Sequence, residues 1–504
     1  MIHLHSSTAQ QRAQWVSILV AQEGSYGVVS QLSKQAKVSR QTLYSWKAKG
    51  RSALQAAFEP KEPPAAISLE RAVLTLLVEG HASYRGIQAC LAVLLGQHVS
   101  LGTITAIVQE AGERAQRWLE QQVCEQARVL ALDEQYSSKR GEAYLNIVDV
   151  HSAQVWATLP AVAVDGESWT LAWWYLHEQG VVSRGTVSDG GRAIAEALRI
   201  SKAMSTHQRD VWHVLYLAAQ VQARLERVVQ EEEERGRLIE RQEQYQASTG
   251  KKAVGRPAKT TGREQERLLS QLHGVLEGVK YLFAQLHQLL EIVVLSQENQ
   301  PRLLDAASRH DEVQAVLDLL EEVGQSAPPP LRKELQRVSK QVRLSLPALL
   351  YFAQELEALQ QEAITPLGEQ AVGLIGWAWQ RRAILGEQPK HLLEAMDPAW
   401  REQATHLLEG WSRAVRASSA VENWHSIVRP HLAVHRSLSA GLLALLAVWH
   451  NHRVAPRGVH EGLSPLQRSG QVKEAKDWLV ALGSAPIPGP EHSTVLKDEE
   501  RLVA

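Results

Sequence analysis

The sequence predicts a mostly helical protein with one small α/β region, and three observations lead to this fold class. Runs of β-branched and apolar residues broken by polar turns, which are typical of strands, are convincing only between Ala127 and about residue 200. From about Leu215 to Thr405 the chain is rich in Leu, Gln, Glu and Ala with helical spacing. Two shorter helical units precede the strands. We therefore expect a single sheet surrounded by helices.

The composition and charge of the chain exclude several classes of protein. Its 504 residues carry 54 Lys and Arg against 55 Asp and Glu, which excludes a uniformly basic polymer-binding protein but not a local basic patch. Only Cys90 and Cys124 are present, which excludes a disulfide framework and a multi-cysteine zinc site. No apolar run approaches the roughly 18 residues of a membrane span. The polar N-terminus does not resemble a signal peptide, so we expect a cytoplasmic protein with no membrane contact.

The first domain, residues 1–58, contains a pattern of two short helices joined by a turn. Leu32 can face Leu43 across this turn, and Ser39 is placed to cap the second helix. This pattern predicts a helix–turn–helix. Three prolines then mark residues 59–67 as a linker, because proline ends helices and stiffens an extended chain.

The predicted helix–turn–helix carries a local positive field. Six basic residues and no acidic residue lie between Gly24 and Phe58, which suits contacts with DNA phosphates. The exposed face of the second helix would present four polar side chains to the major groove, namely Arg40, Gln41, Tyr44 and Lys47. We therefore predict that these residues bind DNA. The alternative is a small protein-interaction module with a solvated basic face.

The second domain, residues 68–120, repeats this outline without the charge. The segment from Ser83 to Gly112 is again typical of two helices joined by a turn, and Ser100 can cap the second of them. Its exposed face has no comparable basic cluster. A second, weaker DNA-binding unit and a plain packing module are equally compatible with this segment.

Two carboxylates lie where predicted strands end. Asp133 follows the apolar run Val129 to Leu132, and Asp189 precedes a Gly-Gly pair that opens a helix. Acidic residues at strand ends are candidate metal ligands, because hard cations such as Mg²⁺ prefer oxygen ligands. A third candidate, Glu422, lies in a helical pattern far downstream. Taken singly, each is also compatible with an ordinary role as a turn, cap or surface residue.

Residues 216–405 form a long helical block. Eight apolar residues in steps of four and three define one stripe, as a long helix that packs against another requires: Leu268, Leu272, Val275, Val279, Leu282, Leu286, Leu289 and Val293. The acidic block Glu231 to Glu234 is predicted to mark a helix end, and Gln246 to Gly262 an exposed loop. Arg256 lies in the Gly-Arg-Pro core of that loop. A basic tip that touches DNA and a merely solvated loop are equally compatible with this motif.

Several motifs resemble those of DDE-type transposases of bacterial insertion sequences. The segments that carry the resemblance are LDEQY (132–136), SDGGRAI (188–194), VENWHSIVRPHLAVHRSLSAGLLALLAVWHNHR (421–453) and GLSPLQ (462–467). Asp210-Val-Trp-His213 further resembles the (C/D)xxH signature of the hAT and Mutator-like group. Members of that group carry a large helical insertion before the catalytic Glu. Here 233 residues separate Asp189 from Glu422, which would be extraordinary for a loop.

The resemblance implies a ribonuclease-H-like catalytic domain that is interrupted by an all-helical insertion. The first part of the catalytic domain would span residues 121–215, and its closing part, with the catalytic Glu, residues 406–470. Between them, residues 216–405 would form the insertion with a coiled-coil-like hairpin. Residues 471–504 would be a C-terminal tail.

The resemblance also implies the site residues. Asp133, Asp189 and Glu422 would form the catalytic triad and hold two Mg²⁺ ions, for which Mn²⁺ can substitute. Glu134 is an alternative first ligand, because it adjoins Asp133. Four residues would lie beside the ligands, namely Asp210, His213, Trp424 and His425. They would orient the site or stack on a base, or they would simply belong to the core.

The expected function is that of a DNA transposase, which binds transposon ends and catalyses metal-dependent strand cleavage and strand transfer. Basic residues near Glu422, among them Arg429 and Arg436, would contact the DNA backbone. Double-stranded DNA would be the partner, bound by a homodimer or larger homo-oligomer in the nucleoid of a bacterial cell. Two alternatives remain. They are a catalytically silent, domesticated or accessory DNA-binding protein and a structural coiled-coil protein.

Overall fold

The computed structural model describes most of the chain, which divides into two compact units. The described residues are 8–58, 67–123, 126–137, 141–161, 163–203, 206–251, 260–295, 301–386, 388–457 and 460–486. One unit consists of Met1–Ser68 with Ile487–Ala504, and the other of Leu69–Pro486. Arg256 and most of the predicted C-terminal tail lie outside the described residues.

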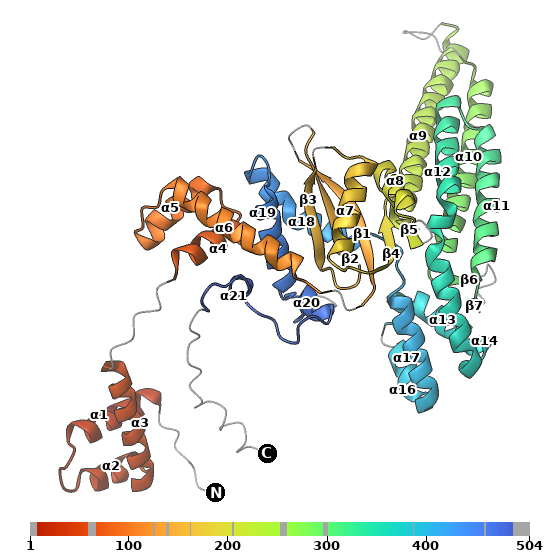
Figure 1. Cartoon of the computed structure of the whole chain (residues 1–504). Coiled ribbons are helices and arrows are strands. Elements are labelled where there is room, and N and C mark those ends of the chain that lie inside the picture. Colours follow the sequence, from red (N-terminus) through yellow and green to blue (C-terminus); the bar gives the residue numbers. More distant parts are fainter. Residues whose placement is uncertain are drawn as a thin grey trace. The chain divides into compact units, whose positions relative to one another are not determined.

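Helices dominate both units, and a five-stranded mixed sheet lies in the second unit (Figure 1). This confirms the predicted mostly helical protein with one small α/β region. A short additional pair of strands, β6 (Val294–Leu295) and β7 (Pro301–Arg302), lies within the helical block. The prediction of a single sheet is therefore wrong in this detail. Within the described part of the chain, no helix combines the length and apolar character needed to cross a bilayer.

Among its described residues, the first unit contains three helices, α1 (Ala9–Ala21), α2 (Val28–Ala36) and α3 (Arg40–Phe58). Each helix contributes one buried leucine to the core, namely Leu19, Leu32 and Leu43. In the turn between α2 and α3, Ser39 Oγ accepts a hydrogen bond from the N–H of Thr42 at 3.0 Å. The predicted packing of Leu32 against Leu43 and the predicted cap at Ser39 are confirmed.

The sheet of the second unit combines antiparallel and parallel pairs. Its strands are β1 (Arg128–Tyr136), β2 (Ala143–Asp149), β3 (Val155–Ala161), β4 (Ser183–Ser188) and β5 (His207–Arg209). Their order across the sheet is β3-β2-β1-β4-β5. The first three strands pair antiparallel, whereas β4 and β5 continue the sheet parallel to β1. β1 is therefore the central strand, with one antiparallel and one parallel neighbour.

Helices cover both faces of the sheet. One face packs on α7 (Gly166–Glu178) and α8 (Arg192–Ile200), and the other on helices from both ends of the unit, including α18 (Ser419–Val434) and α19 (Ala440–His452). Side chains on β1 alternate between these faces. Ala131 joins the core beneath α18 and α19, whereas Leu132 joins the core beneath α7 and α8. The same alternation turns Asp133 toward α18 and Glu134 toward α7. Two short helices follow α19, namely α20 (Pro465–Arg468) and α21 (Trp478–Ala481).

The second predicted helical domain packs into the same core. Its helices are α4 (Leu69–Val78), α5 (Tyr84–Leu95) and α6 (Leu101–Glu120). Where α6 crosses α19, a Cβ atom on Gly112 would lie only 2.8 Å from the Cα atom of Gly441. Only glycine fits such a close approach of two backbones. The segment therefore packs as part of the sheet domain, as one of its two predicted alternatives requires.

The helical block leaves the sheet after β5 and returns to it at α18. Its helices are α9 (Val211–Thr249), α10 (Gly262–Leu289), α11 (Ala306–Gln325), α12 (Pro329–Leu349), α13 (Tyr351–Leu367), α14 (Glu369–Gln380), α15 (Arg382–Leu385), α16 (Gln388–Ala395) and α17 (Pro398–Ser412). The predicted stripe on α10 is confirmed, since all of its residues from Leu272 to Leu289 are buried in the core of the block. Val293 is also buried but lies beyond the end of the helix.

The acidic block does not end a helix. Glu231 to Glu234 lie in the middle of α9, which continues without a break to Thr249. Neighbouring side chains accommodate these carboxylates: the guanidinium of Arg235 lies 2.8 Å from Glu232, and Nε2 of His273 on α10 lies 3.1 Å from Glu233. The prediction of a helix end was therefore wrong, because polar partners within α9 and on α10 accommodate the charge run.

A buried glutamine fastens the helical block to the sheet. Gln208 on β5 is 1% exposed. Its Nε2 donates a hydrogen bond to the carbonyl of Leu349 at 2.9 Å, and its Oε1 accepts one from the N–H of Phe352 at 2.8 Å. These two bonds satisfy backbone groups at the junction of α12 and α13. The block is thus joined to the edge of the sheet at a second point, far from its two ends.

Candidate metal centre

The register of two parallel strands brings Asp133 and Asp189 to the same level of the sheet. Ala131 on β1 pairs with Val187 on β4, and each carboxylate lies two residues further along its chain. Asp189 begins the turn into α8, where its Oδ1 accepts a hydrogen bond from the N–H of Gly191 at 2.7 Å. The two acids are therefore neighbours across adjacent strands. Asp189 follows the end of β4 as predicted, whereas the prediction for Asp133 was wrong in one detail, because β1 continues past it to Tyr136 by pairing with β2.

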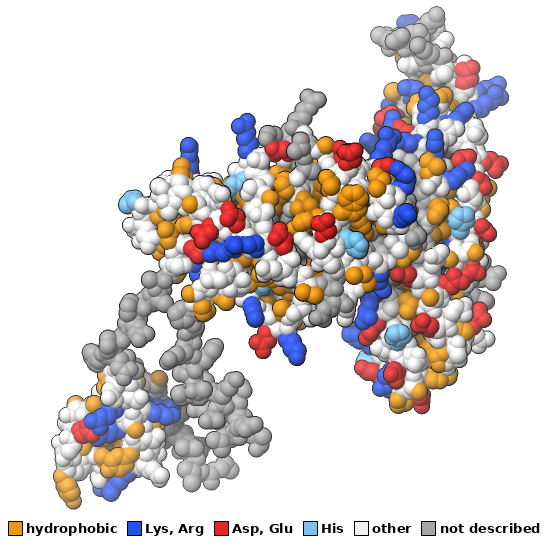
Figure 2. Space-filling view, in the orientation of Figure 1, with side chains coloured by type: hydrophobic (Ala, Val, Ile, Leu, Met, Phe, Trp, Pro, Cys, Tyr) orange, Lys and Arg blue, Asp and Glu red, His pale blue; other side chains and the backbone are white. Residues whose placement is uncertain are grey.

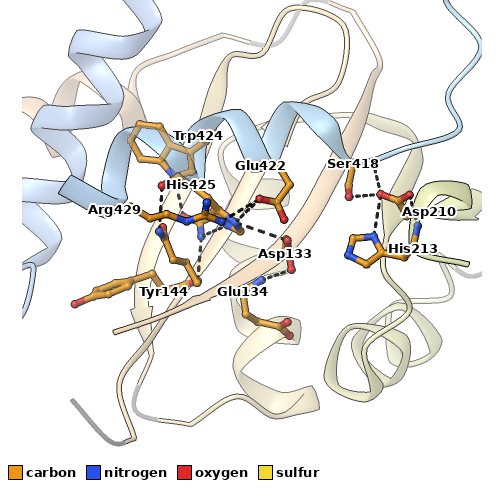
Figure 3. Close-up of polar contacts among 12 residues, drawn as sticks. Asp133, Glu134, Tyr144, Asp210, His213, Ser418, Glu422, Trp424, His425 and Arg429 are labelled. Atoms are coloured by element: carbon orange, nitrogen blue, oxygen red, sulfur yellow. Dashed lines mark hydrogen bonds and ion pairs between the residues drawn. The ribbon is translucent and has the colours of Figure 1, made fainter. Parts of the chain in front are cut away.

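Helix α18 adds two more potential ligands to this level (Figure 3). Glu422 lies in its first turn, and His425 follows one turn later. Among the described residues, one oxygen each of Asp133 and Glu422 and one ring nitrogen of His425 lie within 4.8 Å of one another. Asp189 does not belong to this group. The structure thus brings together two of the three predicted ligands, with His425 as the third member of the group.

Glu134 points to the opposite face of the sheet. Its Oε1 accepts a hydrogen bond from the indole N–H of Trp169 on α7 at 2.8 Å, and Figure 3 shows its side chain directed away from Glu422. The carboxylate of Glu134 also lies near Gly191, next to Asp189: a Cβ atom built on Gly191 would be 3.9 Å from the carboxylate of Glu134 and 3.2 Å from that of Asp189. Of the two alternatives for the first ligand, Asp133 is therefore the one that shares a face with Glu422.

The site concentrates negative charge. Burial raises the pKa of Asp133 from 3.8 to about 7, and the nearby charges of Asp189, Glu134 and Glu422 add to this effect. Burial also raises the pKa of Glu134. A bound divalent cation would relieve this repulsion, and the donor set of carboxylate oxygens is the kind that Mg²⁺ prefers. The residues present could therefore hold a divalent metal ion.

One cation already lies beside Asp189. The guanidinium of Arg209, at the end of β5, is close enough that a Cβ atom on Gly190 would lie 3.2 Å from it. Burial lowers the pKa of Arg209, whereas the charge of Asp189 acts in the opposite direction. Gly190 has a φ angle of +78°, a left-handed conformation that glycine adopts without strain. The turn after β4 thus requires glycine at position 190 for two reasons: its backbone conformation and the short distance between that backbone and the guanidinium of Arg209.

A buried hydrogen-bond network fixes the orientation of His425. The indole N–H of Trp424 donates to Oδ1 of Asn146 on β2 at 2.9 Å, and the hydroxyl of Thr158 donates to the same oxygen at 2.9 Å. An indole nitrogen is only a donor, so Oδ1 of Asn146 must face it. The amide nitrogen of Asn146 then faces Nε2 of His425 at 3.2 Å.

This network determines which nitrogen of His425 carries the proton. Burial lowers the pKa of His425 to about 4, so the ring is neutral at pH 7. Because Asn146 donates to Nε2, the single ring proton lies on Nδ1. That atom lies 3.8 Å from Asp133 Oδ2 and 3.8 Å from Glu422 Oε2. In this tautomer the Nδ1–H faces the two carboxylates, and Nδ1 has no lone pair to offer a metal ion.

Asp210 joins the two ends of the helical block. Its side chain caps α9 by accepting a hydrogen bond from the N–H of Trp212 at 2.7 Å. Its Oδ2 also accepts two hydrogen bonds from Ser418, which immediately precedes α18. Nδ1 of His213 lies 3.3 Å from the same carboxylate, which raises the pKa of His213. Asp210 thus holds the start of α9 against the start of α18. The ring of His213, by contrast, faces the carboxylates of the candidate metal centre.

The site opens into a cleft of about 570 Å³. Asp133, Glu422 and His425 line it together with His213 and Arg429. The guanidinium of Arg429 lies 3.2 Å from Oε2 of Glu422. This ion pair leaves both side chains partly exposed, at 63% and 46% respectively, so the cleft presents a cation next to the candidate ligands.

An exposed aromatic pair lies beside the cleft. Trp212 and Tyr216 are one turn apart on α9, and their rings stack with centroids 5.0 Å apart and planes 8° apart. They are 56% and 49% exposed. Trp212 also contacts the edge of the His213 ring at a centroid distance of 5.2 Å. Exposed aromatic faces of this kind are suited to stacking on nucleobases.

The predicted DNA-contacting residues fall into different environments. On α3, Arg40, Gln41 and Tyr44 are exposed, as the prediction requires. Lys47 is instead engaged by Glu23, with Nζ 3.0 Å from the carboxylate, and Arg51 contacts the same carboxylate at 3.2 Å. Glu23 lies one residue outside the basic segment, so the charge count of that segment missed it. Arg429 is in the cleft, and Arg436 lies in a separate groove.

The sequence prediction missed three residues on which the site depends. Asn146 orients His425, Ser418 holds the start of α18, and Trp169 binds Glu134. Each acts on a partner at least 35 residues away in the sequence. No local motif marks them, since their roles follow from sheet pairing and helix packing. Trp424, considered for base stacking, is fully buried and belongs to the core.

No protein-family model matches this chain, and no curated protein is similar to it at a significant level. The geometry of the site therefore carries the functional argument.

Proposed function

We propose that this chain is a DNA transposase that binds transposon ends and catalyses metal-dependent DNA strand cleavage and strand transfer. One observation carries the proposal. Asp133 and Asp189, which are 56 residues apart in the sequence, lie at the same level of two adjacent strands, and α18 brings Glu422, 233 residues after Asp189, into the same cleft as Asp133. Burial, together with the nearby carboxylates of Asp189, Glu134 and Glu422, raises the pKa of Asp133 to about 7, and a bound divalent cation would offset this cost of the charged form. In the proposal the sheet domain is the ribonuclease-H-like domain that the resemblance implies.

Asp133, Asp189 and Glu422 would hold the ions in this proposal. Mg²⁺, with Mn²⁺ as a substitute, would lower the pKa of an attacking water or 3′-hydroxyl and neutralise the charge that develops on the leaving oxygen. The Nδ1–H of His425 would hold the carboxylates of Asp133 and Glu422 in position. Arg429, which reaches into the cleft beside Glu422, would bind a phosphate of the DNA.

Base stacking is the role that we propose for Trp212 and Tyr216. Both rings are about half exposed, and their neighbour His213 lines the cleft with the candidate ligands. A base displaced from the duplex near the cut could stack on this pair, with a gain of about 1–3 kcal/mol per base. The His213 ring, held by Asp210, would border the same base.

DNA contacts are proposed for both units. In the first unit, α2 and α3 would form a helix–turn–helix, and the exposed Arg40, Gln41 and Tyr44 would face the major groove. In the second unit, Lys and Arg side chains gather where α9 and α12 run side by side (Figure 2). A hollow between these helices is lined by three arginines, namely Arg224, Arg227 and Arg337. Pairing of two DNA ends would require at least two copies of the chain, acting in the nucleoid of a bacterial cell.

A catalytically silent DNA-binding protein is the second candidate function. One observation favours it: Asp189 is turned to the backbone of Gly191 and stands outside the group formed by Asp133, Glu422 and His425. Such a protein would retain the fold and the basic surfaces but would not cleave DNA.

Cleavage of the flanking DNA distinguishes the two functions. The substrate is a duplex that carries the coding sequence with its own genomic flanks, in which terminal inverted repeats should bracket the reading frame. We expect the full chain to cut at the repeat boundaries with Mg²⁺ or Mn²⁺ and not with EDTA. Asp133→Asn, Asp189→Asn and Glu422→Gln should each abolish cutting while the protein still binds the ends.

Glu178→Gln, which alters an exposed carboxylate at the end of α7, is the control and should cut normally. If the wild-type chain binds the ends but does not cleave them with either metal, the second candidate function, a catalytically silent DNA-binding protein, would be supported. Full cleavage by any of the three site variants would overturn the proposed triad.

A further inference from the structure

A second hollow, distinct from the cleft, lies between helices α5, α6 and α19 and the edge of the sheet where β2 begins and β3 ends. It has a volume of about 1050 Å³. The residues of this groove that matter here are Arg85, Tyr144, His435 and Arg436, with Glu142 as its acidic member. We propose that this groove, called here the Arg85–Arg436 groove, binds the backbone of duplex DNA about six base pairs from the scissile phosphate. The inference rests on the proposed function and adds a second, positioned contact to it.

The groove adjoins the cleft directly. On α18, the cleft is lined as far as Ala433, and the lining of the groove starts at the next residue, Val434. On the sheet, the cleft is lined by Gln135 and Tyr136 of β1, whereas the groove is lined by their partners on β2, Tyr144 and Ala143. A ligand that follows α18 out of the cleft therefore enters the groove without crossing an intervening element.

The charge of the groove favours an anion. Arg85 and Arg436 are both exposed, and neither side chain has an ion-pair or hydrogen-bond partner within the described ranges. Arg85 lies in the first turn of α5, where the positive end of the helix dipole makes a cation unfavourable. The first turns of α5, α6 and α19 all face the groove, and none contains an acidic residue. A phosphate would relieve the repulsion between these positive groups.

Two further polar groups of the groove have unused hydrogen-bonding capacity. Tyr144 is 1% exposed, and its hydroxyl oxygen accepts a hydrogen bond from the N–H of Leu438 at 3.0 Å. No described residue accepts the proton of that hydroxyl in return. The Nε2 atom of His435 is buried and likewise lacks a partner among the described residues. Groups of this kind bind phosphate oxygens when they line a cationic groove.

The length of α18 sets the distance from the cut. α18 ends at Val434, 12 residues after Glu422, and Arg436 lies two residues beyond the helix. The helical part rises about 18 Å at 1.5 Å per residue, and the two further residues add at most about 7 Å, which gives a distance between about 18 and 25 Å. Phosphates of one DNA strand succeed one another every 3.4 Å along the duplex axis, so this distance corresponds to about six base pairs. Arg429, halfway along the helix, would contact a phosphate between the two positions.

The test compares the salt dependence of DNA binding in full-length proteins. All variants carry Asp133→Asn, so that no cleavage occurs, and the probe is a fluorescein-labelled 30-base-pair duplex made from the genomic flank of the gene. We expect Arg85→Gln with Arg436→Gln to make the slope of log K against log[salt] less steep by about 1.8, since each lost phosphate contact removes about 0.9. Arg117→Gln, which alters an exposed arginine at the other end of α6, is the matched control and should leave the slope unchanged.

Replacement of single phosphates by neutral methylphosphonates then locates the contact. Interference should fall five to seven nucleotides from the cleavage site (about six, from the phosphate spacing) and should vanish in the double variant. An unchanged salt slope in the double variant, or interference that persists there, would overturn the proposal. A slope change on single-stranded DNA alone would overturn the assignment to a duplex. Failure of the wild-type chain to cleave would overturn the proposed activity and the stated distance from a cleavage site, whereas the change of salt slope, which is measured with the inactive variant, tests the contact with DNA independently.

Discussion

Oδ2 of Asp210 accepts two hydrogen bonds from Ser418, one from the backbone N–H at 2.8 Å and one from the hydroxyl at 2.5 Å, although 208 residues separate the two in the sequence. Asp210 begins α9, and Ser418 immediately precedes α18, which carries Glu422. A third bond, from the N–H of Val211 to the carbonyl of Arg416 at 2.8 Å, joins the same two segments. The large helical block therefore closes on itself at the point where the chain returns to the site.

Loss of the Ser418 hydroxyl should loosen the start of α18. Because the bond is buried and its acceptor is charged, Ser418→Ala should lower the free energy of unfolding by about 1.5–3 kcal/mol. Hydrogen exchange of the amides at the start of α18 should accelerate, because the first turn of the helix loses its anchor. If the proposed activity is correct, cleavage should fall as well, since Glu422 lies in that turn.

Urea unfolding and hydrogen-exchange mass spectrometry check this prediction. Ser426→Ala, which removes an exposed hydroxyl on the same helix, is the control and should change neither measurement appreciably. Slow exchange in the first turn of α18 in Ser418→Ala would contradict the role that we assign to the Asp210–Ser418 bond.

Asp133→Asn should stabilise the protein near neutral pH. The pKa of Asp133 in the folded protein, about 7, is above its ordinary value of 3.8. As the pH rises from about 4 to about 7, the unfolded chain therefore releases a proton that the folded protein retains, and the folded protein becomes relatively less stable. The neutral amide removes this cost, which corresponds to between about 1 and 4 kcal/mol above pH 7. Below pH 4 the two proteins should be equally stable.

Thermal unfolding between pH 4 and pH 8 in EDTA is the measurement. Asp149→Asn is the informative contrast, because Asp149 is also buried in the sheet but accepts hydrogen bonds from the N–H groups of His151 and Ser152. That substitution should destabilise the protein. In the wild-type protein, Mg²⁺ should raise the unfolding temperature more at pH 8 than at pH 6, because the ion competes with the proton on Asp133. A stability difference between Asp133→Asn and wild type that does not vary with pH would be inconsistent with the raised pKa.

Asn146→Asp should reverse the tautomer of His425. A carboxylate at this position would accept a proton from Nε2, which leaves the lone pair of Nδ1 facing Asp133 and Glu422. The site would then offer a nitrogen ligand, which favours Mn²⁺ over Mg²⁺. We expect Mg²⁺-dependent cleavage to fall about 10-fold to 100-fold, the usual effect of changes in the residues that surround a metal site, while Mn²⁺ restores part of it.

Parallel assays with the two metals test this expectation. Thr158→Ala is the control, because it removes one hydrogen bond to Oδ1 of Asn146 without changing the group that faces His425. The same ratio of Mg²⁺ to Mn²⁺ activity in Asn146→Asp and in wild type would show that the tautomer of His425 does not matter.

The parts of this fold that the sequence predicts well are those with local causes. The stripe on α10 follows from apolar spacing, and the assignment of Asp133 and Asp189 to strand-bearing segments follows from the apolar run that precedes each of them. The parts that it does not predict depend on distant partners. Nothing in the sequence around Asn146 marks it as important, because its role depends on α18, which packs against β2 and brings His425 and Trp424 to it. The charge run Glu231 to Glu234 suggests a helix end when its residues are considered alone. Its contacts with Arg235 and with His273 of another helix explain why the helix continues through it.

The engagement of Lys47 by Glu23 leads to the last prediction, which concerns the first unit. Glu23 contacts Lys47 at 3.0 Å and Arg51 at 3.2 Å, and these cations lower its pKa. The carboxylate thus cancels part of the positive field of α3, the helix that we propose to face DNA. Glu23→Gln should release both cations, tighten binding of a random-sequence duplex by about fivefold at low salt, and make the salt dependence steeper by up to about 1.8. Fluorescence anisotropy of the full chain measures both quantities. Glu110→Gln, an exposed change on α6, should leave them as in wild type. If Glu23→Gln also leaves them unchanged, Lys47 and Arg51 do not contact DNA, and the proposed interface of the first unit reduces to Arg40, Gln41 and Tyr44.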